Sequence, residues 1–449
     1  MLPREYPAIT CDSRKVTPGC LFIAVKGAND DGNKYVDAAM KAGAAAYVST
    51  DRLGLARIAD EFYDHPSGKL KLVGITGTNG KTTTVTLLYN MMRSLGYECG
   101  LLSTIANYVG SRRTETTNTT SDPITINRLL AEMVDAGCEY CFMEVSSIGV
   151  EQERVAYLEF AVGIFSNLTH DHLDYHGTFA EYLRCKKLFF DNLPAGATAI
   201  TNIDDRNGSV MVQNTRANVV TYSCRGAADH NCRIIEESFD GMLLKIDGIE
   251  VWTKLIGAHN AYNLLAIYSA AVALGTPVEE ALIALSKLES APGRLENHRG
   301  PRDLSVIIDY AHTPDAMENV LKTLRDVAPE RELICLFGCG GDRDKTKRPE
   351  MAAVAEKFAD RIFVTSDNSR TERTEDIIED IKKGFTPSGL AKAICISDRR
   401  EAIRTAIMLA PEGATILLAG KGHEDYQILG TEKLHFDEKE IVDEVFKTL

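Results

Sequence analysis

The sequence predicts a mixed α/β protein built from three domains. Its 449 residues correspond to about three domains at roughly 150 residues each. Short runs rich in valine and isoleucine alternate with amphipathic stretches over most of the length, and this alternation is typical of parallel α/β folds. Turn-rich segments at DHPSGK (64–69) and APGR (291–294) divide the chain, so we expect domains at 1–69, 70–294 and 295–449.

The first two domains each contain an early predicted strand. LFIAV (21–25) is a short apolar run, and VDAAMKAGAAAYV (36–48) predicts a helix that runs toward a further strand. LKLVGIT (70–76) predicts the strand that opens the middle domain. Apolar residues then recur at helical spacing until Gly96 supplies a stop; they are Val85, Leu88, Met92 and Leu95. The middle domain therefore opens with a strand, a glycine-rich turn and a helix.

The pattern of the last domain predicts a Rossmann-like, doubly wound sheet. A helical stretch, NAYNLLAIYSAAVALG (260–275), precedes it. Four apolar runs, separated by helical stretches such as MENVLKTLRDV (317–327), are predicted strands: VIID (306–309), LICLFG (333–338), RIFVTS (361–366) and TILLAG (415–420). Ligands of open parallel sheets bind outside the carboxyl ends of the strands, so we expect the four following loops to share one pocket.

Composition limits the partners of the chain. The 64 acidic residues outnumber the 50 lysines and arginines, and the net charge of -14 has the wrong sign for general binding to nucleic acid or anionic membranes. No apolar run approaches the roughly 18 residues of a membrane span, and the first residues lack a secretory-signal pattern. We therefore expect a cytoplasmic protein, without membrane insertion, whose cysteines are reduced. The only CxxC pattern, Cys138 to Cys141, lies in an apolar stretch and favours a structural role.

The sharpest chemical signal is GITGTNGKTTT (74–84), where the predicted strand gives way to the helix. Glycines let backbone N–H groups approach phosphate oxygens, and a helix N-terminus adds positive potential. Lys81 is placed to neutralise phosphate charge, and the Thr82 hydroxyl to coordinate Mg²⁺. The strict phosphate-loop spacing fails because Ile75 stands where its first glycine belongs, and two later glycines serve instead. The pattern indicates ATP or GTP binding.

A second signal combines residue types that bind metal ions. FMEVSS (142–147) ends a predicted strand with Glu144, and FSNLTHDHLDYHG (165–177) holds three histidines and two aspartates within seven residues. Imidazole and carboxylate groups suit a divalent cation. Beside a phosphate loop the expected ion is Mg²⁺. For each single histidine, a role as an ordinary polar loop residue stays open.

Together these motifs resemble the Mur ligases, ATP-dependent enzymes that form amide bonds and extend the peptide of peptidoglycan precursors. Within that family the sequence is most similar to members that add the third residue to UDP-N-acetylmuramoyl-L-alanyl-D-glutamate. The resemblance implies an N-terminal UDP-muramoyl-binding domain, a central ATP-binding domain and a C-terminal amino-acid-binding domain. It covers nearly the whole chain and rests on DSRKVTPGCLFIAVKG (12–27), GITGTNGKTT (74–83), TNTTSDP (117–123), MEVSS (143–147), NLTHDHLDYHG (167–177), GAHNAYN (257–263), PGR (292–294), DYAHTPDAMENVL (309–321), FGCGGDRDKTKRP (337–349), SDNSR (366–370) and GKGHEDYQ (420–427).

The resemblance implies the contacts to nucleotide and metal. The residues expected to bind ATP are Gly77, Thr78, Asn79, Gly80, Lys81, Thr82, Thr83, Asn263, Arg294, Asp309 and His312. The expected ligands of two Mg²⁺ ions are Thr82, Glu144, His172 and Lys186. The expected catalytic residues are Lys81, Glu144, His172 and Lys186. Lys186 aligns with a lysine that is carbamylated in the family, which turns a cation into an anion; the adjacent Lys187 is the alternative.

The resemblance also implies contacts to the other two substrates. The residues expected to bind the UDP-muramoyl dipeptide are Ser13, Asn118, Thr119, Thr120, Ser147 and Arg154. The residues expected to bind the incoming amino acid are Arg343, Asp367, Asn368, Arg370, Gly420 and Glu424. In the family, ATP converts the γ-carboxylate of D-glutamate to an acyl phosphate, which the amine of the amino acid then attacks. We expect the chain to act as a monomer.

The loop DNSR (367–370) bears on which amino acid is added. Family members that add meso-2,6-diaminopimelate usually carry Asp-Asn-Pro-Arg there, and the arginine grips the distal carboxylate of the substrate. Here Arg370 is kept and Ser369 replaces the proline. A guanidinium matches a carboxylate in two-point geometry, which favours meso-diaminopimelate. The loss of proline frees φ at position 369, so lanthionine, L-lysine and L-ornithine stay open as alternatives.

Three positions depart from the family pattern. Ile148 stands where relatives commonly have histidine, so one polar contact to substrate is expected to be missing. His259 replaces a usual phenylalanine. LHFDEKE (434–440) departs from the usual Phe-Asp-Asp-Arg-Glu, which puts a role for an arginine there in doubt.

Rival functions share parts of this pattern. Folylpolyglutamate synthase and the fourth muramoyl-peptide ligase have the same phosphate loop and three-domain plan. The motifs DSRKVTPG (12–19), DHLDYHG (171–177) and DNSR (367–370) together argue against the first, and DNSR with GKGHEDYQ (420–427) argues against the second. A non-catalytic binding protein on a ligase scaffold would be expected to lose Lys81, Glu144 or Lys186. All three residues are present, which favours an enzyme.

Overall fold

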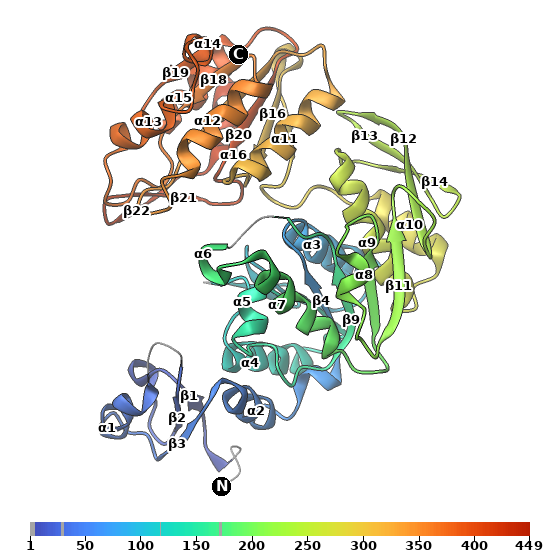
Figure 1. Cartoon of the computed structure of the whole chain (residues 1–449), viewed down its shortest axis with the longest axis vertical. Coiled ribbons are helices and arrows are strands. Elements are labelled where there is room, and N and C mark those ends of the chain that lie inside the picture. The colour runs from blue at the N-terminus through green and yellow to red at the C-terminus, as the bar shows by residue number, and fades with distance from the viewer. Residues whose placement is uncertain (1–4, 28–30, 117, 170–172) are drawn as a thin grey trace. The chain divides into compact units, whose positions relative to one another are not determined.

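The computed structural model describes residues 5–27, 31–116, 118–169 and 173–449. The chain forms two compact units, which Figure 1 shows coloured along the sequence. The first comprises Met1–Ile234, Leu244–Val251 and His259–Leu288, and the second comprises Ile235–Leu243, Trp252–Ala258 and Glu289–Leu449. No described helix is long and apolar enough to cross a lipid bilayer. All eleven cysteines are free, and Cys138 and Cys141 are buried, as expected for structural residues.

The N-terminal part of the first unit is a small α/β layer. Its parallel sheet has the order β1-β2-β3. The elements are β1 (Ile9–Thr10), η2 (Ser13–Lys15), β2 (Leu21–Val25), η3 (Gly32–Tyr35), α1 (Val36–Lys41), β3 (Ala46–Thr50), α2 (Arg52–Phe62) and η4 (Pro66–Lys69). The helix predicted over 36–48 is wrong in its extent, because it ends at Lys41. Gly43 adopts φ +109°, and the chain from Ala46 pairs with β2 instead.

Most of the first unit is built on an eleven-stranded sheet of order β14-β13-β12-β11-β10-β9-β4-β8-β5-β6-β7, of which Ile235–Leu243 and Trp252–Thr253 fall in the second unit. The strands are β4 (Lys71–Thr76), β5 (Cys99–Leu102), β6 (Asn107–Val109), β7 (Arg112–Thr114), β8 (Tyr140–Glu144), β9 (Phe160–Phe165), β10 (Thr198–Asn202), β11 (Asn218–Ser223), β12 (His230–Ser238), β13 (Gly241–Ile246) and β14 (Ile249–Thr253). The predicted strand at 70–76 is confirmed as β4, which pairs in parallel with β8 and β9. The carboxyl ends of these three strands therefore share one edge of the sheet.

Helices pack against this sheet, and one of them, α3, begins directly after the phosphate loop. They are α3 (Lys81–Ser94), α4 (Pro123–Asp135), α5 (Ser147–Glu151), α6 (Leu173–His176), α7 (Phe179–Asp191), α8 (Gly208–Met211), α9 (Ala258–Ala273) and α10 (Val278–Ser286). The helix predicted up to Gly96 is confirmed as α3, and Gly96 adopts φ +95° after its end. The Thr178 side chain caps α7 by accepting from the Glu181 N–H, which orients the helix that carries Lys186.

The second unit is a doubly wound α/β layer, as the sequence predicts. Its main sheet has the order β15-β16-β20-β17-β18-β19, parallel except for β15. The strands are β15 (Glu296–Arg299), β16 (Ser305–Asp309), β17 (Leu333–Phe337), β18 (Arg361–Val364), β19 (Ala393–Cys395) and β20 (Thr415–Ala419), with a separate hairpin of β21 (Tyr426–Leu429) and β22 (Glu432–His435). The helical elements are η5 (Pro301–Asp303), α11 (Pro314–Val327), α12 (Lys347–Phe358), α13 (Thr374–Lys382), α14 (Pro387–Lys392), α15 (Arg399–Leu409) and α16 (Glu438–Phe446).

Hydrophobic cores lie on both faces of this second sheet. Alternate residues of each strand face opposite sides: Ile307 packs with α11 and α12, while Val306 and Ile308 pack with α15 and α16. All four predicted strands are therefore buried on both faces. Their following loops lie at the carboxyl edge of the sheet, where α/β proteins bind ligands.

Candidate active site

The phosphate loop, residues 77–80, connects β4 to α3. Gly77 and Gly80 adopt φ of +154° and +86°. A Cβ at Gly77 would lie 1.9 Å from Ser166 Oγ, and one at Gly80 would lie 2.4 Å from Asn263 Oδ1. Only glycine fits at both positions without displacing a neighbour. The close approach also brings Asn263 of α9 directly to the loop.

The segment after β9 holds the phosphate loop in shape. The Thr78 N–H donates to Asn167 O at 2.8 Å, and the Asn79 N–H donates to Asn167 Oδ1 at 2.9 Å. The Ser166 hydroxyl donates to Asn79 O at 2.7 Å. Thr83 is buried in the first turn of α3. These contacts hold the loop at the N-terminus of α3, where the helix dipole favours an anion.

Thr82, in the first turn of α3, meets Glu144 at the carboxyl end of β8. The Thr82 hydroxyl donates to Glu144 Oε2 at 3.0 Å, and the Thr104 N–H donates to Oε1 at 2.7 Å. A hydroxyl beside a buried carboxylate is the oxygen set that Mg²⁺ prefers. Among the described residues no group of three or more His, Cys, Asp or Glu side chains is arranged to hold a metal ion. His172 lies outside the described residues.

Two lysines reach the backbone of the phosphate loop. Lys81 Nζ donates to Gly77 O at 2.9 Å and to Thr78 O at 2.7 Å. Lys186 Nζ donates to Gly77 O at 2.7 Å, and its side chain is only 1% exposed. Lys187 points elsewhere and pairs with Asp191 at 2.5 Å. Of the two lysines considered for carbamylation, the structure thus places Lys186 at the loop.

Four residues expected to bind the UDP-muramoyl dipeptide lie near Glu144. The Thr120 hydroxyl donates to Glu144 O at 2.9 Å, and Arg154 donates to Thr120 O at 2.6 Å. The Thr104 hydroxyl, next to Glu144, donates to Thr119 Oγ1 at 3.1 Å. Ser147 lies in the first turn of α5, three residues beyond the end of β8.

The two remaining members of this group, Asn118 and Ser13, and the nearby His176 have different surroundings. His176, the last histidine of the segment 165–177, is buried and shares a hydrogen bond of 2.9 Å with Ser147 Oγ, which makes it an ordinary satisfied polar residue. The Asn118 carbonyl accepts from the Thr116 hydroxyl at 2.9 Å, one residue before Thr119. Ser13 belongs to η2 in the N-terminal layer and is not joined to the others by a hydrogen bond among the described residues.

The second unit holds the remaining residues expected to bind ATP. Asp309, at the end of β16, accepts from the Leu295 N–H at 2.7 Å and the Ala311 N–H at 2.8 Å, and burial raises its pKa. Arg294 lies 5.1 Å from the Tyr310 ring centroid, and its buried Nε has no partner among the described residues. His312 Nδ1 lies 2.8 Å from Tyr310 O. Asp309 therefore ties the PGR turn to the loop after β16.

The loops after β17, β18 and β20 gather the residues expected to bind the amino acid. Asn368 Nδ2 donates to Glu424 Oε2 at 3.0 Å, and a Cβ at Gly420 would lie 3.2 Å from Asp367 Oδ2. Arg370 donates to Gly341 O at 2.9 Å. A Cβ at Gly340 would lie 3.1 Å from Arg370 and 3.7 Å from Arg343. The Arg370 guanidinium, the Arg343 side chain and the Glu424 carboxylate thus come from loops at one edge of the sheet.

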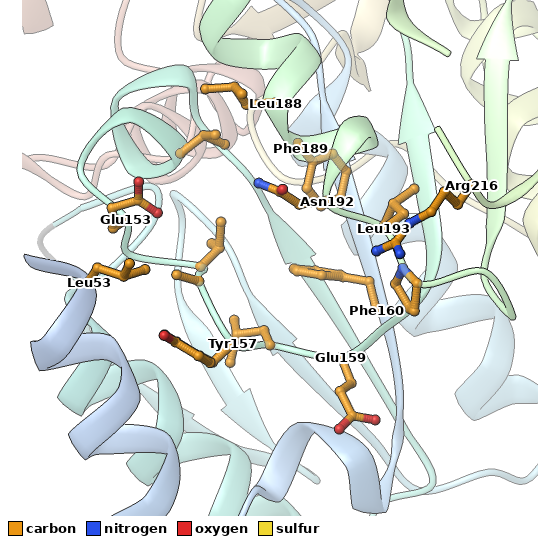
Figure 2. A pocket seen from close by; sticks show the side chains of 15 residues that line it. Leu53, Glu153, Tyr157, Glu159, Phe160, Leu188, Phe189, Asn192, Leu193 and Arg216 are labelled. Carbon is orange, nitrogen blue, oxygen red and sulfur yellow. The ribbon is translucent and has the colours of Figure 1, made fainter. Parts of the chain in front are cut away.

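A cavity of about 540 Å³ lies elsewhere in the first unit. Figure 2 shows its lining, with Phe160 and Phe189 toward the centre and Glu153 and Arg216 on opposite sides of the view. None of the residues expected to bind a substrate lines it. The cavity therefore coincides with none of the predicted site residues.

Comparisons with known proteins bear on the family. Three family models match the chain: Mur ligase family, catalytic domain (residues 5–64), Mur ligase middle domain (75–272) and Mur ligase, glutamate ligase domain (293–422). A Parabacteroides distasonis protein named UDP-N-acetylmuramoyl-L-alanyl-D-glutamate--2,6-diaminopimelate ligase is 50% identical over 98% of this chain and 94% of its own length. A Phocaeicola vulgatus protein of the same name is 49% identical over 99% and 95%. The chain belongs to the Mur ligase family.

The fold of this Mur ligase agrees with that of a solved structure. A structure titled as UDP-N-acetylmuramoyl-L-alanyl-D-glutamate--2,6-diaminopimelate ligase is 31% identical, covers 99% of this chain and 95% of its own, and superposes with a TM-score of 0.72. The predicted three-domain α/β plan is confirmed by this agreement and by the family models. As a Mur ligase, the chain is an ATP-dependent ligase of peptidoglycan precursor synthesis.

The sequence pattern of this Mur ligase missed several residues of the second unit. Lys421 and Gln427 contact the loop after β18, although both lie in the quoted motif GKGHEDYQ. Their position in the same motif as Gly420 and Glu424 was the sequence feature that could have indicated them. Arg399 and Glu438 form a fully buried ion pair close by. No motif of the sequence pointed to that pair.

Proposed function

We propose that this Mur ligase couples ATP cleavage to an amide bond between the D-glutamyl γ-carboxylate of UDP-N-acetylmuramoyl-L-alanyl-D-glutamate and an amine of meso-2,6-diaminopimelate. The observation that carries the proposal is identity of 49% and 50%, over nearly the full chain, to relatives named for that reaction. It favours this ligase over folylpolyglutamate synthase and the fourth muramoyl-peptide ligase. We also propose that domains 1–69, 70–294 and 295–449 bind the UDP-muramoyl part, ATP and the amino acid, and that the enzyme is a cytoplasmic monomer.

The phosphate loop is proposed to hold ATP. Backbone N–H groups at the N-terminus of α3 would face the phosphates, and Lys81, which donates to two loop carbonyls, would turn to the terminal phosphates. Asn263, which lies against the loop, is proposed to contact the nucleotide. Arg294, Asp309 and His312 are also proposed to bind ATP. The buried Arg294 Nε has no hydrogen-bond partner among the described residues, which supports a role of this side chain in binding a phosphate anion.

Two Mg²⁺ ions are part of the proposal. Thr82, Glu144, His172 and the carbamate of Lys186 would hold them, and the ions would neutralise charge on the phosphate oxygens. Adjacent oxygens of Thr82 and Glu144 fit such an ion. The position of Lys186 Nζ, 2.7 Å from Gly77 O, supports a carbamate there, because its oxygens would lie beside the phosphate loop.

The chemistry divides into two displacements. A carboxylate is a poor acylating agent at neutral pH, so its oxygen attacks the γ-phosphorus of ATP, the bond to the bridging oxygen breaks, and ADP and an acyl phosphate form. The neutral amine then attacks the acyl carbon, an amide forms, a proton leaves the nitrogen and phosphate departs. Thr119, Thr120 and Arg154 beside Glu144 would place the dipeptide carboxylate at the phosphate loop. Lys81 would stabilise the negative charge that gathers there.

The loops of the second unit are proposed to select the amino acid. Arg370 and Arg343 flank Gly340 and suit the distal carboxylate of diaminopimelate. Glu424, Asp367 and Asn368 suit its amines, with Gly420 as a backbone contact. The Ser369 N–H donates to no acceptor among the described residues. The usual proline would therefore remove no hydrogen bond at that position, which supports a loop that works as in diaminopimelate-adding relatives.

The test measures phosphate release from ATP and Mg²⁺ with the UDP-dipeptide and, in parallel, meso-diaminopimelate, lanthionine, L-lysine or L-ornithine at equal concentration. We expect a strong preference for meso-diaminopimelate. Preference for another amino acid would keep the ligase reaction and overturn the assigned substrate. Absence of phosphate release with all four amino acids would overturn the proposed function in favour of a non-catalytic role.

A further inference from the structure

A lysine lies completely buried among the loops that the proposed function assigns to the amino acid. Lys421, two residues after β20, has no exposed side-chain surface. Its Nζ lies 3.1 Å from Glu424 Oε2, 3.3 Å from Asn368 Oδ1 and 3.6 Å from Asp367 Oδ1. The ammonium therefore contacts three of the groups expected to form the site.

These contacts compensate the charge of the buried lysine. A buried ammonium without partners is strongly destabilising, so such a group persists only where oxygens surround it. Nζ donates hydrogen bonds to Glu424 Oε2 and Asn368 Oδ1 and forms an ion pair with Asp367, and the rings of Tyr426 and Phe436 lie 5.6 and 5.9 Å from Nζ. The charge is therefore held at a defined point, away from solvent.

The two oxygens of Glu424 are used differently. Oε2 accepts from both Lys421 Nζ and Asn368 Nδ2. Oε1 accepts no hydrogen bond from any other described residue. Only Oε2 of Glu424 is therefore hydrogen-bonded to the described residues, and Oε1 can accept a hydrogen bond from an amine that enters the site.

Other residues already hold the loops in place. Arg399 donates to Ser366 O at 3.2 Å and to Ala419 O at 2.9 Å, and so joins the backbone just before each loop. Gln427 Nε2 donates to Ser366 Oγ at 2.9 Å and Asp367 O at 3.0 Å. The backbone frame therefore does not depend on Lys421, whose contacts are to side chains.

We propose that Lys421 is a positioning residue that fixes the Glu424 carboxylate so that Oε1 receives the amine of the incoming amino acid. The inference rests on the proposed function. The polar contacts of Lys421 Nζ are all to residues of the proposed amino-acid site. Lys421 should therefore affect the binding of the amino acid and not the binding of ATP or the UDP-dipeptide. Lys421 matters for the second displacement and not for formation of the acyl phosphate.

The test compares Lys421→Met with the parent enzyme in steady-state kinetics for each substrate. Methionine keeps much of the side-chain volume and removes the charge and the donors. We expect the KM for diaminopimelate to rise by roughly thirtyfold or more, as for loss of one partner in a buried charged pair. The KM values for ATP and UDP-dipeptide should stay unchanged. Isotope exchange between bridging and non-bridging β-phosphate oxygens of ATP, measured without amino acid, should also persist.

Two matched variants keep the inference open to refutation. Lys433→Met removes an exposed lysine that lies 3.9 Å from the Tyr426 ring centroid, and it should leave all kinetic constants unchanged. In a Glu424→Gln background, Lys421→Met should add little, because the lysine acts through Glu424. This double variant also removes opposite charges together, so it serves if the single variant fails to fold.

Equal changes in all three KM values, or additive effects of the two substitutions, would overturn the positioning role. Absence of UDP-dipeptide-dependent exchange in the parent enzyme would overturn the proposed function and the inference with it. Normal exchange in the parent with an unchanged KM for diaminopimelate in Lys421→Met would overturn the inference alone.

Discussion

Removal of Glu438 tests how the second unit stabilises a fully buried charge. Glu438 Oε1 on α16 accepts from Arg399 Nε at 2.8 Å, and neither side chain is exposed. At an effective dielectric constant of about 20, two charges roughly 3 Å apart attract by about 5–6 kcal/mol, and the desolvation of both ions offsets much of this. The pair itself therefore adds little net stability. Loss of one partner is different, because it leaves the other charge buried and uncompensated.

We expect Glu438→Gln to lower the free energy of unfolding of the second unit. Breaking a buried ion pair costs roughly 3–5 kcal/mol. Because Arg399 keeps Ser366 O and Ala419 O as acceptors, we expect the lower end, about 3 kcal/mol. For a domain of this size that corresponds to a thermal transition roughly 6–12 °C lower. Urea unfolding followed by circular dichroism measures the free energy, and calorimetry resolves the transition.

Two controls make the reasoning refutable. Glu440→Gln, on the same helix, removes an exposed carboxylate that pairs with His435, and it should change the free energy of unfolding by less than about 0.5 kcal/mol. Arg399→Met with Glu438→Met removes both charges and should recover much of the stability lost by Glu438→Gln. A Glu438→Gln protein whose free energy of unfolding lies within about 0.5 kcal/mol of the parent would refute the argument.

Single side chains elsewhere give further tests. Lys186→Ala is expected to lose roughly a hundredfold in turnover and to regain part of it with short carboxylic acids; full activity without them would end the carbamate proposal. Arg370→Ala should raise the KM for diaminopimelate roughly ten- to hundredfold, and an unchanged apparent affinity would remove Arg370 from the site. Hydrogen bonds from Arg348 and Lys345 lower the pKa of Glu372 to about 2. Since this folded-state pKa lies below the ordinary 4.5, the stabilisation is complete above pH 4.5 and is lost as pH falls toward about 2. Urea midpoints of Glu372→Gln should fall less over this range, and an identical acid dependence in both proteins would contradict the linkage.

Local sequence determined much of the fold and of the nucleotide loop. The strands at 70–76, 306–309 and 415–420 follow from apolar runs of strand length, and α3 follows from helical spacing that ends before Gly96. Glycines at 77 and 80 indicate the phosphate loop because no other residue tolerates their backbone and close neighbours. These features can be predicted from the sequence, because each depends on residues that lie within a few positions of one another along the chain.

Tertiary structure decided what depends on distant parts of the chain. The sequence left Lys186 and Lys187 as alternatives, and only the packing of α7 against β4 brings one of them to Gly77 O. The helix predicted over 36–48 ends at Lys41, and the residues from Ala46 form β3, because pairing with β2 outweighed the helix propensity of the alanines. The contacts of Lys421 join loops more than fifty residues apart, so no local pattern could reveal them. A buried charge takes its role from the oxygens that the fold assembles around it.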